Sequence, residues 1–326
     1  LTLYKYFAEM KISKLILSIF VTGCLLAGCQ RGGYAVFSGY TQGGTYTVKA
    51  DLTGVTVPEE EIASHIDAIL DSIDFSLSGY NKNSLLTRFN AGVEIVPDRF
   101  FSEIRDLSER YRTQTGGAFD AASAPLFDIW GFGFTSDSLP DPARVQAALL
   151  ACKEEKVLNF NAIAQGYTCD VVAGYLHSLG VHNMLVDIGE IFCEGLNPSG
   201  KGWTIGVDNP VDGNDTPGQD LRGIWQSDGR ACGIVTSGNY RKFYVKDGRK
   251  YAHTIDPRTG YPVEHDLLSA TVVAPTAAEA DALATACMVI GPDAARALIL
   301  GRPELEGYLI TATGTWTSDG FSLLIP

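Results

Sequence analysis

Residues 235–291 carry the most informative pattern in the chain and read VTSGNYRKFYVKDGRKYAHTIDPRTGYPVEHDLLSATVVAPTAAEADALATACMVIG. Residues 241–245 and 250–255 are rich in β-prone side chains, and the turn between them contains an Asp-Gly pair. An Asp-Gly turn between two such runs is typical of a β-hairpin. Residues 256–260 follow as a loop that Pro257 stiffens and a glycine ends. The stretch therefore predicts a hairpin followed by a well-defined loop.

The second half of the same stretch predicts a strand and then a helix. Residues 267–273 are β-prone, and Thr276 with Glu279 three residues later forms a capping-box pattern at a helix start. Asp281 and Thr285 are four residues apart and therefore share one face of that helix. Two oxygen side chains stacked in this way suit a hard cation such as Mg²⁺. The alternative is a pair of solvated surface side chains, which spacing alone leaves open.

Composition excludes some classes of function. The chain has 326 residues, a formal net charge of −13 and an acidic pI of about 4.8. This balance excludes a general nucleic-acid binder, which needs a basic face, but a bound divalent cation could still attract a phosphate-bearing ligand. Downstream of Cys29 the chain has five cysteines, an odd number with no C-x-x-C pair, so neither a cysteine zinc site nor a disulfide framework is indicated. We predict that they are small buried apolar residues.

The N-terminal region has the pattern of an export signal. Lys11 and Lys14 precede an apolar run over residues 15–26, and the run ends in the sequence Leu-Ala-Gly before Cys29. The run is too short for a typical membrane-spanning helix. We predict a signal peptide over residues 1–28, a lipidated N-terminus and tether over 29–44, and one domain over 45–326. The alternative is a plain N-terminal helix.

Periodicity predicts a mixture of helices and strands along the rest of the chain. Apolar residues at helical spacing indicate helices, and short alternating or apolar runs indicate strands. The last residues, 308–326, are predicted to form two short strands joined by a turn at 318–320. The other predicted elements are helices over 58–76, 98–115 and 140–151, strands over 46–50, 184–189 and 203–207, and a surface loop over 209–221.

Three ordered motifs resemble the C-terminal signature of the ApbE family of FAD:protein FMN transferases: Ser237-Gly-Asn-Tyr240, His253-Thr-Ile-Asp-Pro-Arg-Thr-Gly260 and Glu279-Ala-Asp-Ala-Leu-Ala-Thr285. The resemblance extends over nearly all of residues 45–326. It implies an α+β fold, namely a two-lobed, ApbE-like (T-fold-like) mixed α/β protein with the ligand cleft between the lobes. It also implies transfer of FMN from FAD to a Thr or Ser hydroxyl of an acceptor protein, with release of AMP.

The same resemblance implies the catalytic and metal-binding residues. Asp281, Thr285 and the backbone carbonyl of Ala162 would hold Mg²⁺. His253 would act with Asp281 in catalysis, as the base or as the group that orients the acceptor hydroxyl. Taken alone, His253 is more often a packed histidine than a catalyst.

The resemblance also implies a set of residues that bind FAD. Asn159 and Gln165 stand where the family usually has Asp and Lys, so they keep hydrogen-bonding capacity and lose charge. For Asp120 the alternative is a cap of the following turn, and for Tyr80 it is a surface aromatic. Arg258 is expected to pair with Asp256, or else to reach a phosphate. The complete set is Gly43, Tyr80, Ala118, Phe119, Asp120, Asn159, Gln165, Ser237, Gly238 and Ile255.

Export and the family resemblance together suggest partners and a location. We expect an exported bacterial lipoprotein, anchored by lipid on Cys29 at the periplasmic side of a membrane, whose acceptors are extracytoplasmic subunits of redox complexes. Two other functions remain open. One is an FAD pyrophosphatase that releases FMN and AMP, and the other is a non-catalytic flavin-binding lipoprotein.

Overall fold

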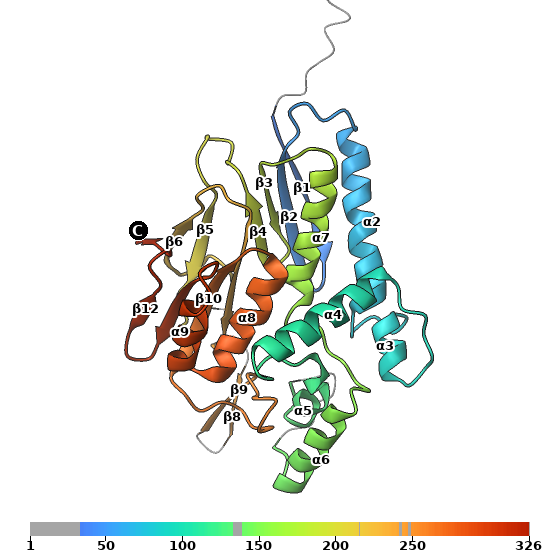
Figure 1. Cartoon of the computed structure of the whole chain (residues 1–326), viewed down its shortest axis with the longest axis vertical. Helices are drawn as coiled ribbons and strands as arrows, with labels where there is room; N and C mark the ends of the chain where they lie inside the picture. The colour runs from blue at the N-terminus through green and yellow to red at the C-terminus, as the bar shows by residue number, and fades with distance from the viewer. Residues whose placement is uncertain (1–32, 133–138, 215, 241–242, 247–248, 326) are drawn as a thin grey trace, which may run out of the picture.

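The computed structural model describes residues 33–132, 139–214, 216–240, 243–246 and 249–325. Its central element is an eight-stranded sheet with the order β1-β2-β3-β4-β7-β10-β11-β12, in which every neighbouring pair is antiparallel. Figure 1 shows these strands running side by side behind the helices. The strands are β1 (Tyr34–Thr41), β2 (Gly44–Asp51), β3 (Met184–Asp187), β4 (Ile191–Glu194), β7 (Cys232–Gly238), β10 (Leu267–Ala274), β11 (Glu306–Thr311) and β12 (Thr315–Thr317).

Two smaller sheets accompany the large one. The first has the order β13-β6-β5, and the second is the hairpin of β8 and β9. The hairpin confirms the strands predicted on both sides of the Asp-Gly turn, although the turn itself lies outside the described residues. The strands of these sheets are β5 (Thr204–Asp208), β6 (Leu221–Gln226), β13 (Leu323–Leu324), β8 (Phe243–Lys246) and β9 (Arg249–Ala252).

Three long helices cover one face of the large sheet: α2 (Glu59–Leu77), α7 (Ala164–Ser178) and α8 (Ala277–Ile290). A second lobe contains the remaining helices except α9, and in Figure 1 it lies below α2 and α7. The other helices are α3 (Leu85–Asn90), α4 (Arg99–Gln114), the 3₁₀ helix η1 (Ala121–Ser123), α5 (Ala124–Ile129), α6 (Pro142–Lys153) and α9 (Pro292–Leu300).

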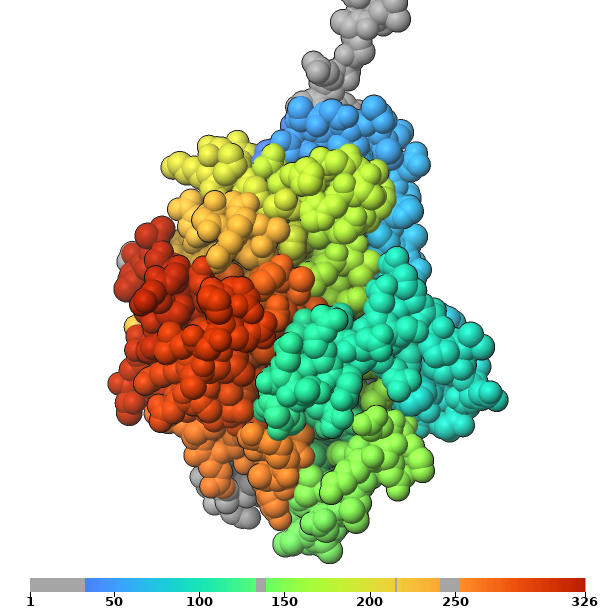
Figure 2. All heavy atoms as spheres, viewed as in Figure 1, coloured from blue at the N-terminus to red at the C-terminus, as the bar shows by residue number. Residues whose placement is uncertain are grey.

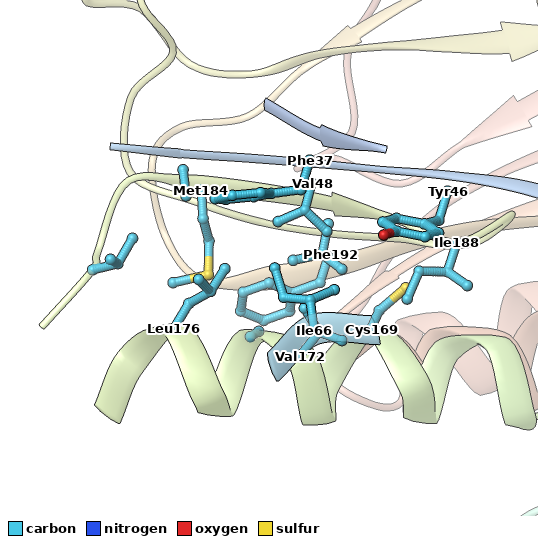
Figure 3. Close-up of a cluster of buried hydrophobic side chains, with 14 of the residues drawn as sticks. Phe37, Tyr46, Val48, Ile66, Cys169, Val172, Leu176, Met184, Ile188 and Phe192 are labelled. Carbon is cyan, nitrogen blue, oxygen red and sulfur yellow. The ribbon is translucent and has the colours of Figure 1, made fainter. Parts of the chain in front are cut away.

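A large apolar cluster lies between the large sheet and the helices α2 and α7. Val48 and Met184 of the sheet meet Ile66 of α2 and Leu176 of α7, and all four are fully buried (Figure 3). Burial of each such side chain contributes about 1.5–3 kcal/mol. The opposite face of the sheet packs on β5 and β6 through large residues such as Trp203. The protein is therefore layered as helices, large sheet and small sheet.

The second lobe is attached to the first through α4 and α8. Asp98 caps α4 by accepting a hydrogen bond from the Phe101 N–H at 2.8 Å. Phe101 and Ile104 of α4 share a buried cluster with Ala282 and Ala286 of α8. In the space-filling view, α4 (teal) lies directly against α8 (orange) (Figure 2). This contact fixes the position of α8 relative to both lobes.

The structure confirms the predicted α+β class and corrects three local predictions. Tyr34–Thr41, assigned to the tether, is β1, and residues 1–32 lie outside the described part of the chain. Residues 318–320 link β12 of the large sheet to β13 of the small sheet, because β11 already pairs with β12 through a turn near Gly314. Thr276 caps α8, but the Glu279 carboxylate pairs with Arg302, so half of the capping box forms.

Two further observations bear on the sequence predictions. The five cysteines of the folded part are buried and free, as predicted. None of the helices in the described ranges is both long and apolar enough to cross a membrane.

Candidate active site

A cleft of about 370 Å³ opens where the two lobes meet. Its walls come from the loop after α2, the segment after α4, the loop before α7, the end of β7, the loop after β9 and one face of α8. These segments lie far apart in the sequence, and the fold brings them together. Twelve predicted site residues line the cleft: Tyr80, Ala118, Phe119, Asp120, Asn159, Ala162, Ser237, Gly238, His253, Ile255, Asp281 and Thr285.

Asp281 is the buried carboxylate of the cleft wall. Its side chain accepts a hydrogen bond from the Gly166 N–H at 3.1 Å, and the residue is 4% exposed. Burial raises the pKa of Asp281 to about 7, and the nearby Asp170 carboxylate adds to the increase. Among the described residues no Lys or Arg forms an ion pair with it. Thr285 follows one turn later on the same face of α8, as the spacing predicts.

Two features of α7 hold the start of α8 in place. The Asp170 carboxylate accepts hydrogen bonds from the N–H groups of Ala277 and Ala278 at 2.8 and 2.9 Å, so it caps α8 from a neighbouring helix. The backbones also approach closely, because a Cβ on Gly166 would lie 2.3 Å from the Ala277 carbonyl oxygen. Position 166 therefore requires glycine, and the contact sets the depth of Asp281 in the cleft.

The wall opposite α8 is built from short polar loops. The Asp120 side chain accepts a hydrogen bond from the Ala122 N–H at 2.8 Å, so it caps η1 and also lines the cleft. Burial raises the pKa of Asp120. The Asn159 side chain accepts a hydrogen bond from the Asn161 N–H at 2.9 Å, and the Asn161 amide lies 3.4 Å from the Tyr80 hydroxyl. Tyr80 is 72% exposed and stands at the mouth of the cleft.

The loop after β9 forms the third wall. His253 meets the Phe132 ring edge to face at 6.3 Å, and Ile255 is fully buried. The Arg258 guanidinium binds both oxygens of the Asp256 carboxylate at 2.8 Å, which is the loop-bracing arrangement. The indole N–H of Trp130 donates to the Gly260 carbonyl at 2.8 Å, so this loop is tied to the second lobe.

Gly43 and Gln165 are predicted site residues that do not line the cleft. Gly43 lies in the tight turn between β1 and β2, where its φ of 81° favours glycine. The neighbouring Gln42 amide donates to the Thr168 hydroxyl at 2.7 Å, so this turn rests on α7. Gln165 lies in the first turn of α7 and packs closely on Gly189. A Cβ added to Gly189 would lie 2.6 Å from the side-chain amide nitrogen of Gln165. Their roles in ligand binding stay predictions.

Several cleft residues were not predicted from the sequence. Met288 could have been predicted, because it lies seven residues after Asp281 and therefore on the same face of the helix. Tyr240 ends the Ser237–Tyr240 motif, which marked its neighbourhood although its own side chain was not predicted to bind the ligand. Phe127 and Phe132 lie in a short helix and just after it, and their spacing does not distinguish them from packing residues. Glu190 belongs to the turn between β3 and β4. Together with Val289, these residues give the cleft both apolar and polar walls.

A second cavity, of about 530 Å³, runs along α4 and shares Asp120 with the cleft. Its lining includes Arg105, Arg112 and Glu109, and it contains neither Asp281 nor a histidine. The cleft between the lobes is the better candidate active site because the buried carboxylate, the hydroxyl of Thr285 and His253 converge there.

Solved structures place this architecture among the flavin transferases. The protein is similar to the flavin transferase ApbE from Vibrio cholerae, with 28% identity, a TM-score of 0.75, and coverage of 88% of this chain and 98% of that one. It is also similar to the apo form of the Pseudomonas stutzeri flavinyl transferase ApbE, with 33% identity, a TM-score of 0.74, and coverage of 88% and 94%.

Sequence comparison identifies the family. Residues 43–309 match the ApbE family. The FAD:protein FMN transferase of Haemophilus influenzae is 32% identical over 88% of this chain and 90% of its own length. That of Escherichia coli K12 is 30% identical over 95% and 96%. The chain therefore belongs to the ApbE family and is an enzyme of the transferase class.

Proposed function

We propose that the protein is a Mg²⁺-dependent FAD:protein FMN transferase that joins FMN to a Thr or Ser hydroxyl of an acceptor protein and releases AMP. The observation that carries this proposal is the Asp281 carboxylate, which is buried in the wall of the cleft with one hydrogen bond and no cationic partner among the described residues. Buried carboxylates are normally paired with a cation or bound to a metal. A buried carboxylate without a cationic side-chain partner is suited to bind a metal cation that enters the cleft together with the substrate.

The chemistry of the donors fits Mg²⁺. Asp281 offers a carboxylate, Thr285 a hydroxyl and Ala162 a backbone carbonyl, and all three residues line the cleft. Mg²⁺ prefers oxygen ligands and usually combines one or two carboxylates with waters and substrate phosphates. When bound, Mg²⁺ would neutralise the negative charge of the FAD pyrophosphate and the charge that develops on it.

The residues of the chain supply binding and orientation. The acceptor oxygen forms a bond to the phosphorus of the FMN half, the bond from that phosphorus to the AMP oxygen breaks, and AMP carries away the bond electrons. Catalysis of such a transfer rests mainly on positioning and charge stabilisation. Phe119 and Ile255 offer apolar surface to the flavin nucleotide, while Asp120 and Asn159 offer hydrogen-bond acceptors.

His253 is the proposed acceptor of the hydroxyl proton. It is the histidine that lines the cleft, it is partly buried, and its ring is steadied by Phe132. A base acts only if it reaches the hydroxyl in the complex. Replacing His253 with Gln should therefore lower kcat and change its dependence on pH, while FAD still binds.

The test uses residues 30–326, which retain every described element because the described fold begins at Gly33. The protein is mixed with FAD, Mg²⁺ and a Thr-containing flavin-acceptor domain, and mass spectrometry follows the FMN adduct. Asp281→Asn removes the charge with little change in shape. Asp293→Asn on α9 is the matched control, because that side chain is 96% exposed.

The expected result is an adduct with the unaltered protein and with Asp293→Asn, and none with Asp281→Asn. Free FMN and AMP without an adduct, with several acceptor domains, would replace the proposal by an FAD pyrophosphatase. FAD that binds and stays intact would indicate a flavin carrier.

We also propose that the mature protein is held at the periplasmic side of a bacterial membrane by lipid on Cys29. Support comes from the basic, apolar and small-residue pattern before Cys29. Stable anchoring requires more than one acyl chain. Expression of the full chain followed by membrane fractionation tests this, since Cys29→Ser should move the protein into the soluble fraction.

A further inference from the structure

His177, His182 and Glu194 form a cluster remote from the cleft. One ligand atom of each side chain lies within 4.8 Å of the corresponding atoms of the other two. The Glu194 carboxylate contacts the His177 Nε2, and its second oxygen lies 3.3 Å from the His182 Nδ1. The three residues are absent from the lining of the cleft and belong to different segments, namely the last turn of α7, the connection to β3 and the end of β4.

We propose that this His–His–Glu cluster is a binding site for a divalent transition-metal ion, and specifically for Zn²⁺. Two imidazole nitrogens and one carboxylate oxygen are a common ligand set for zinc, with water in the fourth position. Tetrahedral ligand atoms around zinc lie about 3.4 Å apart, because each is about 2.1 Å from the metal. The 3.3 Å separation of His182 and Glu194 fits this spacing.

The surrounding structure holds the ligands in position. Gly195 follows Glu194 directly and has a φ of 66°. It lies so close to His182 that a Cβ on Gly195 would be 2.3 Å from the His182 carbonyl oxygen. The Trp203 indole N–H donates to the Glu194 carbonyl at 2.9 Å. His177 lies at the C-terminal end of α7, where the helix dipole favours a cation. The two histidine rings are 5.5 Å apart, centre to centre.

The exposure of the three side chains indicates an open site. The Glu194 side chain is 18% exposed, that of His177 36% and that of His182 69%. A metal ion would therefore enter the site directly from the solvent, and at least one of its coordination positions would be occupied by water. Because the ligands belong to three segments, bound Zn²⁺ would tie the end of α7 to the end of β4.

The site lies at the end of the molecule where the chain enters the fold. The Tyr34 hydroxyl, at the start of β1, bonds to the Leu196 carbonyl two residues after Glu194. In Figure 1 this end of α7 points away from the second lobe. Zinc binding here is therefore independent of the oxygen ligands proposed around Asp281.

The experiment uses residues 30–326, purified without a polyhistidine tag and freed of metal with EDTA. Zn²⁺ is titrated calorimetrically in the presence of excess Mg²⁺, and Co²⁺ is used in parallel because tetrahedral Co²⁺ with such ligands absorbs strongly in the visible range. The variants are His182→Gln and Glu194→Gln. His65→Gln is the matched control, since His65 is an exposed histidine that stacks on Tyr175.

We expect one equivalent of Zn²⁺ to bind to the unaltered protein and to His65→Gln. Binding should be about 100-fold weaker or worse in His182→Gln. Saturating Zn²⁺ should raise the Tm of the unaltered protein by about 4 °C at a hundredfold excess over Kd. Because His182 is exposed, its replacement should leave the fold intact, and circular dichroism of the variant would check this.

Equal Zn²⁺ affinity in the unaltered protein and in His182→Gln would overturn the proposal. So would Zn²⁺ binding that is lost in Asp281→Asn and kept in His182→Gln, because the metal would then occupy the cleft. Absence of binding at micromolar Zn²⁺ would show that the cluster is a hydrogen-bonded triad without a metal.

Discussion

Gly166 offers the most direct test of how the fold positions the active site. Replacing it with Ala adds one methyl group where α7 crosses the start of α8. That Cβ would lie 2.3 Å from the Ala277 carbonyl oxygen and 2.9 Å from the Ala278 nitrogen, whereas ordinary contacts begin at 3.4 Å. Both alanines are fully buried, so the two helices must separate by about 1 Å or distort.

The loss of folding free energy caused by Gly166→Ala follows from this geometry. Overpacking of this kind costs about 1–3 kcal/mol, and the clash with backbone atoms places Gly166→Ala at the upper end. The better helix propensity of Ala returns about 1 kcal/mol. The net loss of about 2 kcal/mol should lower the Tm by about 3 °C in a chain of this length. Since Asp281 moves with α8, a displacement of about 1 Å should reduce flavin transfer on the order of 100-fold.

Gly174→Ala on the same helix is the matched control, because its Cβ would meet nothing within 4 Å. This variant should keep full activity, and its stability should rise by about 0.5–1 kcal/mol. Thermal unfolding and adduct formation measure both effects. If the two variants show equal Tm values and equal activity, the close approach at Gly166 does not position α8 and the reasoning is refuted.

Three further predictions test other parts of the structure. Asn90 holds the backbone of Leu158 through two hydrogen bonds of 2.8 Å, so Asn90→Ala should lower the free energy of unfolding by about 2–4 kcal/mol; a loss below 1 kcal/mol in urea titration would contradict this. Burial raises the pKa of Asp170 from 3.8 to about 7, so the folded protein holds this proton more tightly than the unfolded chain. The contribution to stability is complete below about pH 4 and is lost as the pH rises through 7. Metal-free protein should therefore lose about 1 kcal/mol between pH 6 and 8, measured as a fall in Tm that Asp170→Asn reduces. Arg258 braces its loop through Asp256, so Arg258→Gln and Asp256→Asn should weaken FAD binding equally in a fluorescence titration; a loss confined to Arg258→Gln would mean that its guanidinium contacts phosphate.

Local patterns predicted the elements with strong boundary signals. Thr276 fixes the start of α8, and the spacing of Asp281 and Thr285 places both on the cleft face. By contrast, the glycine-rich composition of residues 32–44 predicts a tether where the structure has β1. Its partner β2 begins only two residues further on, so the pairing is local, and the signal that was missed is the tight turn at Gln42 and Gly43.

The active site was predictable only in part, because its residues come from segments that are far apart in the sequence. The motifs indicated which residues carry chemistry, and the fold brings twelve of them to one cleft. Phe127 and Phe132 line the same cleft, although their spacing does not separate them from ordinary packing residues. Their position follows from the meeting of the two lobes, which is a long-range property. The same holds for Gly43 and Gln165, whose placement outside the lining depends on the turn of β1 and β2 and on Gly189.

The wide spacing of the cleft segments along the chain has a consequence for biosynthesis. A ribosome makes Tyr80, Asp120 and Asn159 long before it makes α8, so an incomplete chain presents one side of the cleft without Asp281 and Thr285. Contacts between distant segments also form late in folding. The nascent protein therefore cannot capture FAD on its way out of the ribosome. It meets its substrate only after the last helices have docked, in whatever compartment folding is completed.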